Sequence, residues 1–329
     1  MKSLITKNDK IFVAGSSGMA GSAIRRALLR SGYGNPLMGG EMLTPSRSEL
    51  NLSNFADVNS WFGAHSPDVV ILAAAKVGGI QANSTHPTEF LLENIKIQSN
   101  VIESAWKSGV KRLLFLGSSC IYPKFASQPI TEESLMTGLL EQTNEAYAIA
   151  KIAGIKLCQA FRNQYNFDAI SLMPTNLYGP GDNYNKESSH VLPAMIRRFY
   201  EAIIYKEPSV TCWGSGKVKR EFLHVDDLGD AAVFALQNWN PSNNELPYIN
   251  VGSGSDITIK ELALTIADFL DYRGEIKWDS NKPDGTPRKL LDVSRLTTLG
   301  WQNKISLQKG IQMTIQQFKN EYDTGSVRK

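Results

Sequence analysis

Short apolar runs alternate along the first half of the chain with segments whose apolar positions repeat at the period of a helix. The runs are rich in β-branched residues and have the length of buried strands. They cover residues 11–14, 41–44, 68–75, 113–117 and 169–173. Helical patterns are clearest at 88–108 and 146–161. Strands and helices that alternate in this way predict an α/β fold with a doubly wound parallel sheet.

A glycine-rich turn joins the first predicted strand to the helix that follows it. The turn reads Gly15-Ser16-Ser17-Gly18-Met19-Ala20-Gly21. Between a strand and a helix, such glycines let the backbone approach a pyrophosphate, whose charge then lies at the helix N-terminus. A tight turn that needs glycine only for a positive φ is the alternative. The context favours a dinucleotide-binding turn.

The second half of the chain departs from the alternation. Residues 182–189 are polar and rich in turn-forming residues. We therefore predict that residues 1–178 form a dinucleotide-binding domain of the Rossmann type, and that 179–329 form mainly a smaller, C-terminal substrate-binding domain. The apolar run at 248–251 is expected to return to the first sheet as a later strand. Residues 324–329 are expected to be a frayed tail.

The end of the second predicted strand bears on which dinucleotide is bound. A carboxylate usually stands there when the ribose has a free 2′-hydroxyl. Here the sequence is Thr44-Pro45-Ser46-Arg47. A guanidinium can pair with a 2′-phosphate, so this end predicts NADP(H) rather than NAD. The alternative is that Arg47 pairs with Glu49 at the surface.

Tyr147 and Lys151 carry the candidate chemistry of a reductase. They are four residues apart, so on a helix they project from the same face. A lysine beside a phenol is expected to favour the phenolate and to lower the pKa of Tyr147 toward the working pH. Such a phenol can protonate the alkoxide that forms when a carbonyl accepts hydride. Ser118 and Ser119 follow the apolar run 113–117, as hydroxyls at a strand end would.

Composition and charge narrow the class of partner. The chain has 329 residues, a net charge of +3 and 42% hydrophobic residues, which argues against nucleic acid or an anionic membrane as partner. No run approaches the ~20 apolar residues of a spanning helix, and no signal peptide is visible. Cys120, Cys158 and Cys212 lie far apart, which predicts no disulfide and no metal site and fits a cytoplasmic protein.

Three signals stand in order along the chain: the glycine turn, Ser-Ser-x-x-Tyr-Pro at 118–123, and Tyr147-x-x-x-Lys151. This order resembles the extended short-chain dehydrogenases/reductases that act on nucleotide sugars, over nearly the whole chain. Further motifs resemble the GDP-sugar epimerase/reductases of that family, at residues 76–80, 117–123, 173–180, 213–216, 220–227 and 282–292. One departure is that some members carry a basic residue in the glycine turn, where this chain has Ser16 and Ser17.

The resemblance implies a reaction and a set of residues. The substrate would be a GDP-linked 4-keto-6-deoxy sugar, epimerised at C3 and C5 and then reduced at C4 with NADPH. Cys120 and His190 match the base and the acid of the epimerisation, and Ser118, Tyr147 and Lys151 match the residues of the reduction. Substrate contacts are implied for Arg198, Trp213, Arg220 and Asp284. NADP(H) contacts are implied for Gly15, Ser16, Ser17, Gly18, Met19, Ala20, Gly21, Arg47, Leu52, Leu116, Gly117, Ser118, Ser119, Lys151, Pro174, Thr175, Asn176, Leu177 and His190.

Each of these residues has a plainer alternative. A lone cysteine such as Cys120 is usually a small buried hydrophobe, and His190 could simply cap the helix at 191–200. Asp284 could only form a turn. Arg198, Trp213 and Arg220 could be packing residues. Asn94, within the predicted helix at 88–108, is expected to be structural and to bond a backbone carbonyl.

Two other functions would suit the same fold. An NAD-dependent nucleotide-sugar 4-epimerase would not need Cys120 and His190 as a base–acid pair, and would prefer a carboxylate after the second strand. A non-catalytic dinucleotide sensor would not need Ser118, Tyr147 and Lys151 together. The resemblance further implies a homodimer that pairs through the helices at 88–108 and 145–163.

Overall fold

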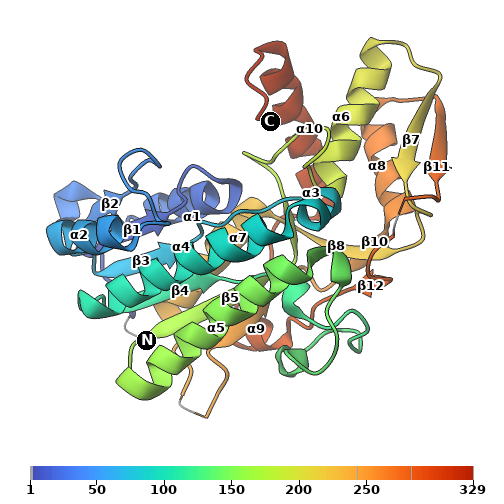
Figure 1. Ribbon diagram of the computed structural model, residues 1–329. Helices are drawn as coiled ribbons and strands as arrows, with labels where there is room; N and C mark the ends of the chain where they lie inside the picture. The colour runs from blue at the N-terminus through green and yellow to red at the C-terminus, as the bar shows by residue number, and fades with distance from the viewer. Residues whose placement is uncertain (1–2, 243, 283, 329) are drawn as a thin grey trace.

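The computed structural model describes residues 3–242, 244–282 and 284–328. Its largest sheet has six strands in the order β2-β1-β3-β4-β5-β9, and every neighbouring pair is parallel. The predicted doubly wound parallel sheet is therefore confirmed (Figure 1). The strands are β1 (Lys10–Ala14), β2 (Glu41–Leu43), β3 (Val69–Leu72), β4 (Arg112–Leu116), β5 (Ala169–Pro174) and β9 (Tyr248–Val251).

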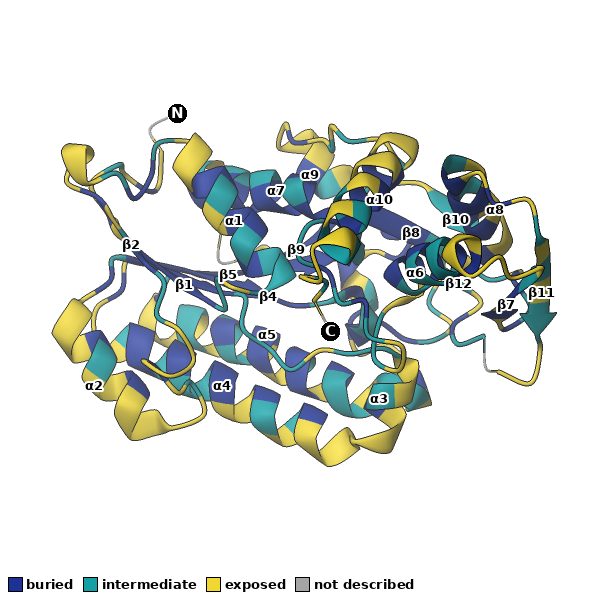
Figure 2. Ribbon diagram, turned by 90° about the horizontal axis from the view of Figure 1, so that it is seen from above, coloured by how far each residue is buried: buried dark blue, intermediate teal, exposed yellow. Residues whose placement is uncertain are grey.

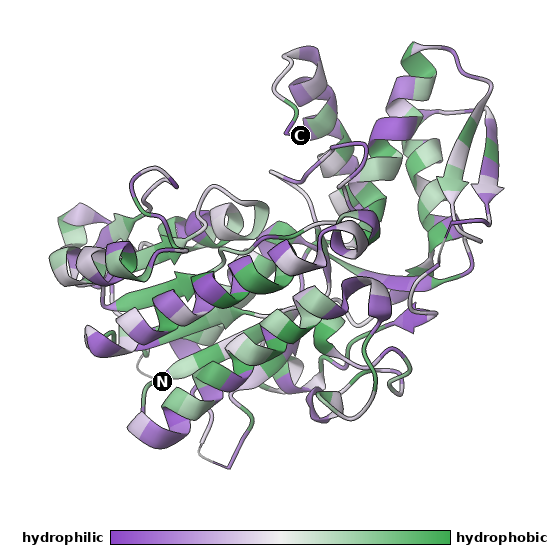
Figure 3. Cartoon of the chain, viewed as in Figure 1, coloured by the Kyte–Doolittle hydropathy of each residue, from purple (hydrophilic) through white to green (hydrophobic). Residues whose placement is uncertain are grey.

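Helices cover both faces of this sheet (Figure 2). One face is covered by α2 (Phe55–His65), α4 (Pro87–Lys107) and α5 (Glu145–Tyr165), and the other by α1 (Met19–Arg30), α7 (Val225–Asn238) and α9 (Ser294–Thr298). Successive strand residues point to opposite faces, so Phe12 and Ile11 of β1 belong to two different apolar cores. Because both faces are covered, the inner strands are mainly apolar (Figure 3): β3 is apolar along its whole length, and β4 is apolar after Arg112.

The glycine turn lies where the direction of strand succession reverses. The chain leaves β1 toward β2 on one side and later returns to β3 on the other, and such a switch point opens a crevice at the carboxyl ends of the strands. Gly15 has φ +83°, and a Cβ there would lie 2.7 Å from the backbone of Ala74. A Cβ on Gly21 would lie 2.1 Å from the carbonyl oxygen of Gly15. Both positions therefore require glycine.

The second part of the molecule has a core of its own. It contains a sheet in which β8 (Lys219–His224) pairs with β6 (Asn176–Tyr178), β10 (Asp256–Thr258) and β12 (Arg288–Lys289). A separate parallel pair joins β7 (Ser209–Trp213) and β11 (Glu275–Asp279). Around them lie α6 (Val191–Ile204), α8 (Ile259–Leu270) and α10 (Leu307–Asp323). A short helix, α3 (Ile80–Thr85), follows the residues after β3.

More of the second half returns to the first sheet than the single strand that we predicted. Helix α7 packs against α1, where Gly229 lies so close that a Cβ would be 2.6 Å from the carbonyl oxygen of Ala23. Trp301 joins the same core. The strand β9 takes the predicted place at the sheet edge.

The frayed tail that we predicted for residues 324–329 is wrong for the residues that the structure describes. The backbone carbonyl of Arg328 accepts the N–H of Tyr184 at 3.0 Å. The guanidinium of Arg328 donates to the carbonyl of Gly181 at 2.6 Å. Val327 also packs against the second core. Within the described ranges, none of the helices is both long and apolar enough to cross a membrane.

Candidate active site

The end of β4 carries a serine and a cysteine side by side. After Leu116 the chain turns into a short 3-10 helix, Ser119–Ile121, and Ser118 is its N-cap. The Ser118 hydroxyl accepts the N–H of Cys120 at 3.4 Å, and its Oγ lies 2.8 Å from the Cys120 Sγ. The capping turn therefore brings a hydroxyl and a thiol together at the carboxyl end of a central strand.

Helix α5 places Tyr147 and Lys151 against this strand end. It packs closely on the sheet, since a Cβ on Gly154 would lie 2.5 Å from the Phe115 ring. Lys151 is 3% exposed and its ammonium donates to the carbonyl of Leu116 at 2.7 Å. The same Nζ lies 5.9 Å from the ring centroid of Tyr147. The helical spacing therefore puts both side chains over the end of β4 as predicted from the sequence.

The pKa of Tyr147 differs from the expectation. We predicted that Lys151 would lower it, but burial raises the pKa of Tyr147 strongly, the charge of Cys120 raises it further, and the hydrogen bond from Ser118 lowers it. The lysine points at a carbonyl rather than at the phenol, and burial lowers its own pKa to about 8. Tyr147 is therefore a neutral phenol across the physiological range, which is the form that can donate a proton.

His190 precedes α6 as its N-cap residue, and its side chain makes no capping hydrogen bond. His190 therefore stands at the cap position, but its side chain does not act as a helix cap. The residue is exposed, yet the protein atoms around its ring desolvate the imidazole and lower its pKa, and the nearby charge of Lys289 lowers it further. His190 is thus mainly a neutral imidazole near pH 7.

A second set of predicted residues lies on the other part of the molecule. The guanidinium of Arg198, on α6, lies 4.9 Å from the ring centroid of Trp213, at the end of β7. The ammonium of Lys282 lies 5.1 Å from the same centroid. Trp213 is 43% exposed, so an aromatic surface flanked by cations faces solvent.

Arg220 and Asp284 hold two loops together. The carboxylate of Asp284 accepts the N–H and the hydroxyl of Ser215, each at 2.8 Å. Its backbone carbonyl accepts the guanidinium of Arg220 at 3.2 Å. Burial lowers the pKa of Arg220 to about 10, and the charges of Asp284 and Glu141 oppose that shift. The carboxylate of Asp284 thus fixes the loop that follows Trp213, whatever contact it makes with a substrate.

Most of the predicted dinucleotide contacts stand at or just after the carboxyl ends of β1, β2, β4 and β5. Gly18 caps α1 without a side-chain hydrogen bond, and no acidic residue stands in the first turn of that helix. The backbone N–H groups of this helix end can therefore bind an anion. Thr175 and Asn176 follow β5 and both bond the carbonyl of Glu221. The glycine cradle and the free helix end therefore fit a dinucleotide.

The structure also gives the places of three further residues from the sequence analysis. Asn94 accepts the backbone N–H of Lys76 at 2.8 Å and donates to its carbonyl at 3.0 Å, so it has the structural role that we expected. The carbonyl of Leu52 accepts the amide of Asn100 at 2.9 Å. Arg47 is exposed in the turn after β2. The carboxylate of Glu49 accepts the N–H of Ser46 at 2.7 Å, and within the described ranges no ion pair joins it to Arg47.

Sequence reasoning missed two charged residues of this site. Lys289 lines a small hollow together with Cys120, and so does Glu141. Lys289 belongs to the segment 282–292, which as a whole resembles the GDP-sugar epimerase/reductases. No periodicity or spacing within that segment distinguished Lys289 from a surface lysine. Glu141 belongs to the long connection between β4 and α5, which carries no repeating pattern at all.

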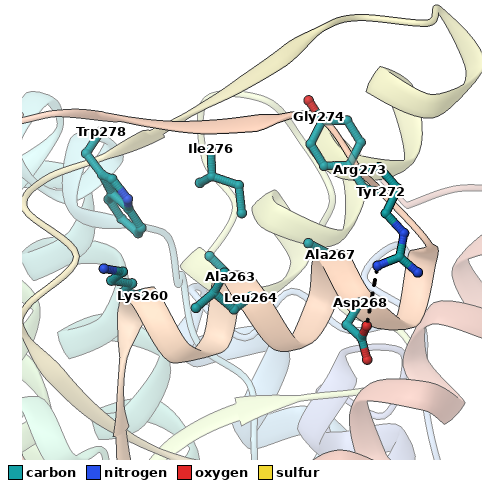
Figure 4. Close-up of a pocket in the computed structure, with 10 residues that line it drawn as sticks. All are labelled: Lys260, Ala263, Leu264, Ala267, Asp268, Tyr272, Arg273, Gly274, Ile276 and Trp278. Carbon is teal, nitrogen blue, oxygen red and sulfur yellow. Dashed lines mark ion pairs between the residues drawn. The ribbon is translucent and has the colours of Figure 1, made fainter.

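A hollow of about 650 Å³ lies elsewhere (Figure 4). Helix α8 and strand β11 form its sides, with Trp278 and Lys260 at one end and the Asp268–Arg273 ion pair at the other. None of the catalytic candidates lines it. The chemistry therefore lies at the end of β4, in a narrower space.

Residues 11–252 match the model of the NAD dependent epimerase/dehydratase family. The chain belongs to this family, and the resemblance to the extended short-chain dehydrogenases/reductases is confirmed. It is an enzyme that takes a nicotinamide dinucleotide.

Named relatives make the comparison more specific. A protein of Arabidopsis thaliana named GDP-L-fucose synthase 1 is 54% identical over 314 residues, which cover 95% of this chain and 94% of that protein. The GDP-L-fucose synthase of Escherichia coli (strain K12) is 51% identical over 323 residues, covering 96% and 98%. The crystal structure of a GDP-L-fucose synthetase from Naegleria fowleri bound to NADP has a TM-score of 0.86, with 26% identity, and covers 98% of this chain and 97% of that one.

Proposed function

We propose that the chain converts GDP-4-keto-6-deoxymannose into GDP-L-fucose, by epimerisation at C3 and C5 followed by reduction at C4. The observation that carries the proposal is the thiol of Cys120, which lies 2.8 Å from the Ser118 hydroxyl at the end of β4. A reductase alone needs the serine, tyrosine and lysine, whereas a base at the same strand end serves the inversion of carbon centres. The relatives named GDP-L-fucose synthase support the same reaction.

Epimerisation begins at the carbons beside the C4 carbonyl. Their protons are acidic because the carbanion is delocalised onto the carbonyl oxygen as an enolate. The Cys120 thiolate removes a proton from one face of the ring. The His190 imidazole takes up a proton from solvent and returns it to the other face, which inverts the centre. The hydroxyl of Ser118 donates to the enolate oxygen and holds it in place.

Reduction uses the same oxygen. The nicotinamide dinucleotide supplies the hydride that C4 accepts. Tyr147 is a neutral phenol, so it gives its proton to the oxygen of C4 as the alcohol forms. Ser118 accepts or donates at that oxygen throughout, and Lys151 holds the ribose beside the phenol. Solvent then restores the proton of Tyr147.

NADP(H) is the dinucleotide that the end of β2 favours. Thr44, Pro45 and Ser46 provide no carboxylate for a ribose 2′-hydroxyl, and Arg47 is exposed there with its guanidinium available for a 2′-phosphate. The 4-epimerase alternative would require a carboxylate at this place. The NADP-bound structure from Naegleria fowleri is in keeping with this choice.

The second part of the molecule would hold the GDP group. Arg198 and Arg220 are guanidiniums that suit a diphosphate, and the face of Trp213 suits a base. Residues 1–178 would thus bind mainly the cofactor and 179–329 mainly the substrate. We also propose a two-fold dimer through α4 and α5, because Leu92, Ile95 and Ile149 are large apolar side chains exposed on these helices.

The test of the proposed function is incubation of the purified protein with NADPH and GDP-4-keto-6-deoxymannose. Absorbance at 340 nm follows NADPH oxidation, and NMR of the product gives the configuration at C3, C4 and C5. We expect oxidation only in the presence of the sugar, with GDP-L-fucose as product. A reduced sugar that keeps the D-configuration would show a reductase without epimerase activity, and would contradict the proposal.

A further inference from the structure

Two ammonium groups lie near the thiol of Cys120, one of them buried and the other half-buried. One is Lys151, which belongs to the reductase motif. The other is Lys289, which lines the same small hollow as Cys120, together with Glu141, Asn144 and Thr286. The reductase chemistry gives no role to this second lysine.

The backbone holds Lys289 firmly in this position. It ends the two-residue strand β12, in register with Arg220 of β8. The next residue, Leu290, donates its N–H to the side-chain oxygen of Gln128 at 2.8 Å. The segment that holds Lys289 is therefore fixed by β8 on one side and by the side chain of Gln128 on the other.

An ammonium that is partly removed from solvent, such as that of Lys289, is stabilised by a counter-charge. The carboxylate in the same hollow, Glu141, is already bound by Lys124 at 2.8 Å. Arg220, also close to Lys289, has the same sign as Lys289, and His190 is uncharged for most of the pH range. Burial lowers the pKa of Lys289, the charge of Arg220 lowers it further, and the charges of Cys120 and Glu141 oppose the shift. That leaves the thiol of Cys120, which lines the same hollow, as a group that can supply the counter-charge.

We propose that Lys289 is a positioning residue for proton abstraction, and that its ammonium supplies the counter-charge for the Cys120 thiolate. The inference rests on the proposed function, in which Cys120 is the base. The physical reason is that a cation close to a thiol favours its thiolate over the neutral form. The carboxylate of Glu141 lies in the same hollow, and its negative charge limits how far Lys289 can favour the thiolate.

The test is the pH dependence of Cys120 alkylation by iodoacetamide in the free enzyme, quantified by peptide mass spectrometry. Cys158 and Cys212 do not compete, because both are buried and burial raises their pKa to about 12 and about 11. We expect Lys289→Met to move the midpoint of alkylation upward by about one pH unit. Lys289→Arg, which keeps the charge, should restore the wild-type midpoint.

Lys282→Met is the matched control, since Lys282 lies in the same segment but over Trp213. Its midpoint should equal that of the wild type. Lys289→Gln, which keeps a polar head, replaces Lys289→Met if circular dichroism shows the latter to be unfolded. An unchanged midpoint in the Lys289 variant, with only a higher KM for the GDP-sugar, would make Lys289 a diphosphate ligand and overturn the inference.

The two proposals fail separately. Alkylation is measured without substrate, so a shifted midpoint in a protein that forms no GDP-L-fucose would sink only the proposed function. An unshifted midpoint in a protein that forms GDP-L-fucose would sink only the role of Lys289.

Discussion

The Oγ of Ser118 lies 2.8 Å from the Sγ of Cys120, at the carboxyl end of β4. The pair arises because a serine caps the 3-10 turn that follows the strand. In the reaction that we propose, the hydroxyl serves the carbonyl oxygen and the thiol serves the neighbouring carbons. One turn of backbone therefore connects the two half-reactions.

Cys120→Ser should stop the inversion, because a hydroxyl is too weakly acidic to serve as the base. General bases contribute about 10² to 10⁴-fold to rate, so we expect a loss of that size in GDP-L-fucose formation. NMR of the product should show, at most, a slowly reduced sugar with the original configuration at C3 and C5. A loss below tenfold would mean that Cys120 is structural.

Tyr147→Phe should abolish reduction and leave epimerisation. The variant lacks the proton donor for the C4 oxygen but keeps Cys120 and His190. NADPH oxidation at 340 nm should therefore disappear, while deuterium from heavy water still enters C3 or C5. If exchange stops as completely as reduction, Tyr147 acts in both steps and the division of roles is wrong.

Arg47→Ala should weaken NADPH binding far more than NADH binding. Loss of a charge-assisted pair with the 2′-phosphate costs roughly 2 to 3 kcal/mol, which isothermal titration with each dinucleotide would show. Arg25→Ala, an exposed arginine on α1, is the control and should leave the ratio unchanged. Equal weakening of NADPH and NADH by the Arg47 variant would remove its assignment to the 2′-phosphate.

Lys151 should make stability depend on alkaline pH. Burial lowers its pKa to about 8 in the folded chain, against about 10.4 when unfolded, so the charged form destabilises the fold at neutral pH. This penalty is fully present below pH 8 and is lost as the pH rises from 8 toward 10.4. We expect the stability of Lys151→Met relative to wild type to fall steadily over that window, measured by urea unfolding. A difference that does not change with pH would contradict the shifted lysine.

The dimer is tested by the mass in solution. Light scattering at micromolar concentration should give twice the mass of the chain, and Leu92→Glu on α4 should reduce it to that of a monomer. Leu264→Glu is the control, because Leu264 is 51% exposed on α8, away from the proposed interface. A monomeric wild type would refute the pairing.

The sequence predicted those features that depend on local pattern. Apolar runs predicted the six strands of the main sheet, because both of its faces are covered. The spacing of Tyr147 and Lys151 predicted that they share one face of a helix. The glycine turn predicted a close approach of backbone, and a Cβ at Gly15 or Gly21 would indeed clash with neighbouring backbone atoms.

Features that depend on distant partners could not be predicted in this way. The pKa of Tyr147 follows from its burial and from Cys120, whereas the four-residue spacing suggested only Lys151. Arg328 is fixed by the turn at Gly181, which no pattern near the C-terminus indicates. Lys289 lines the same hollow as Cys120 because β12 pairs with β8.

The most direct test of the central claim is the reaction of the wild-type enzyme with NADPH and GDP-4-keto-6-deoxymannose in heavy water. If one site performs both half-reactions, the NMR spectrum should show GDP-L-fucose with deuterium at C3 and C5, and one NADPH should be oxidised for each product molecule. A product that carries protium at both carbons and keeps the D-configuration, formed with the same use of NADPH, would contradict the account.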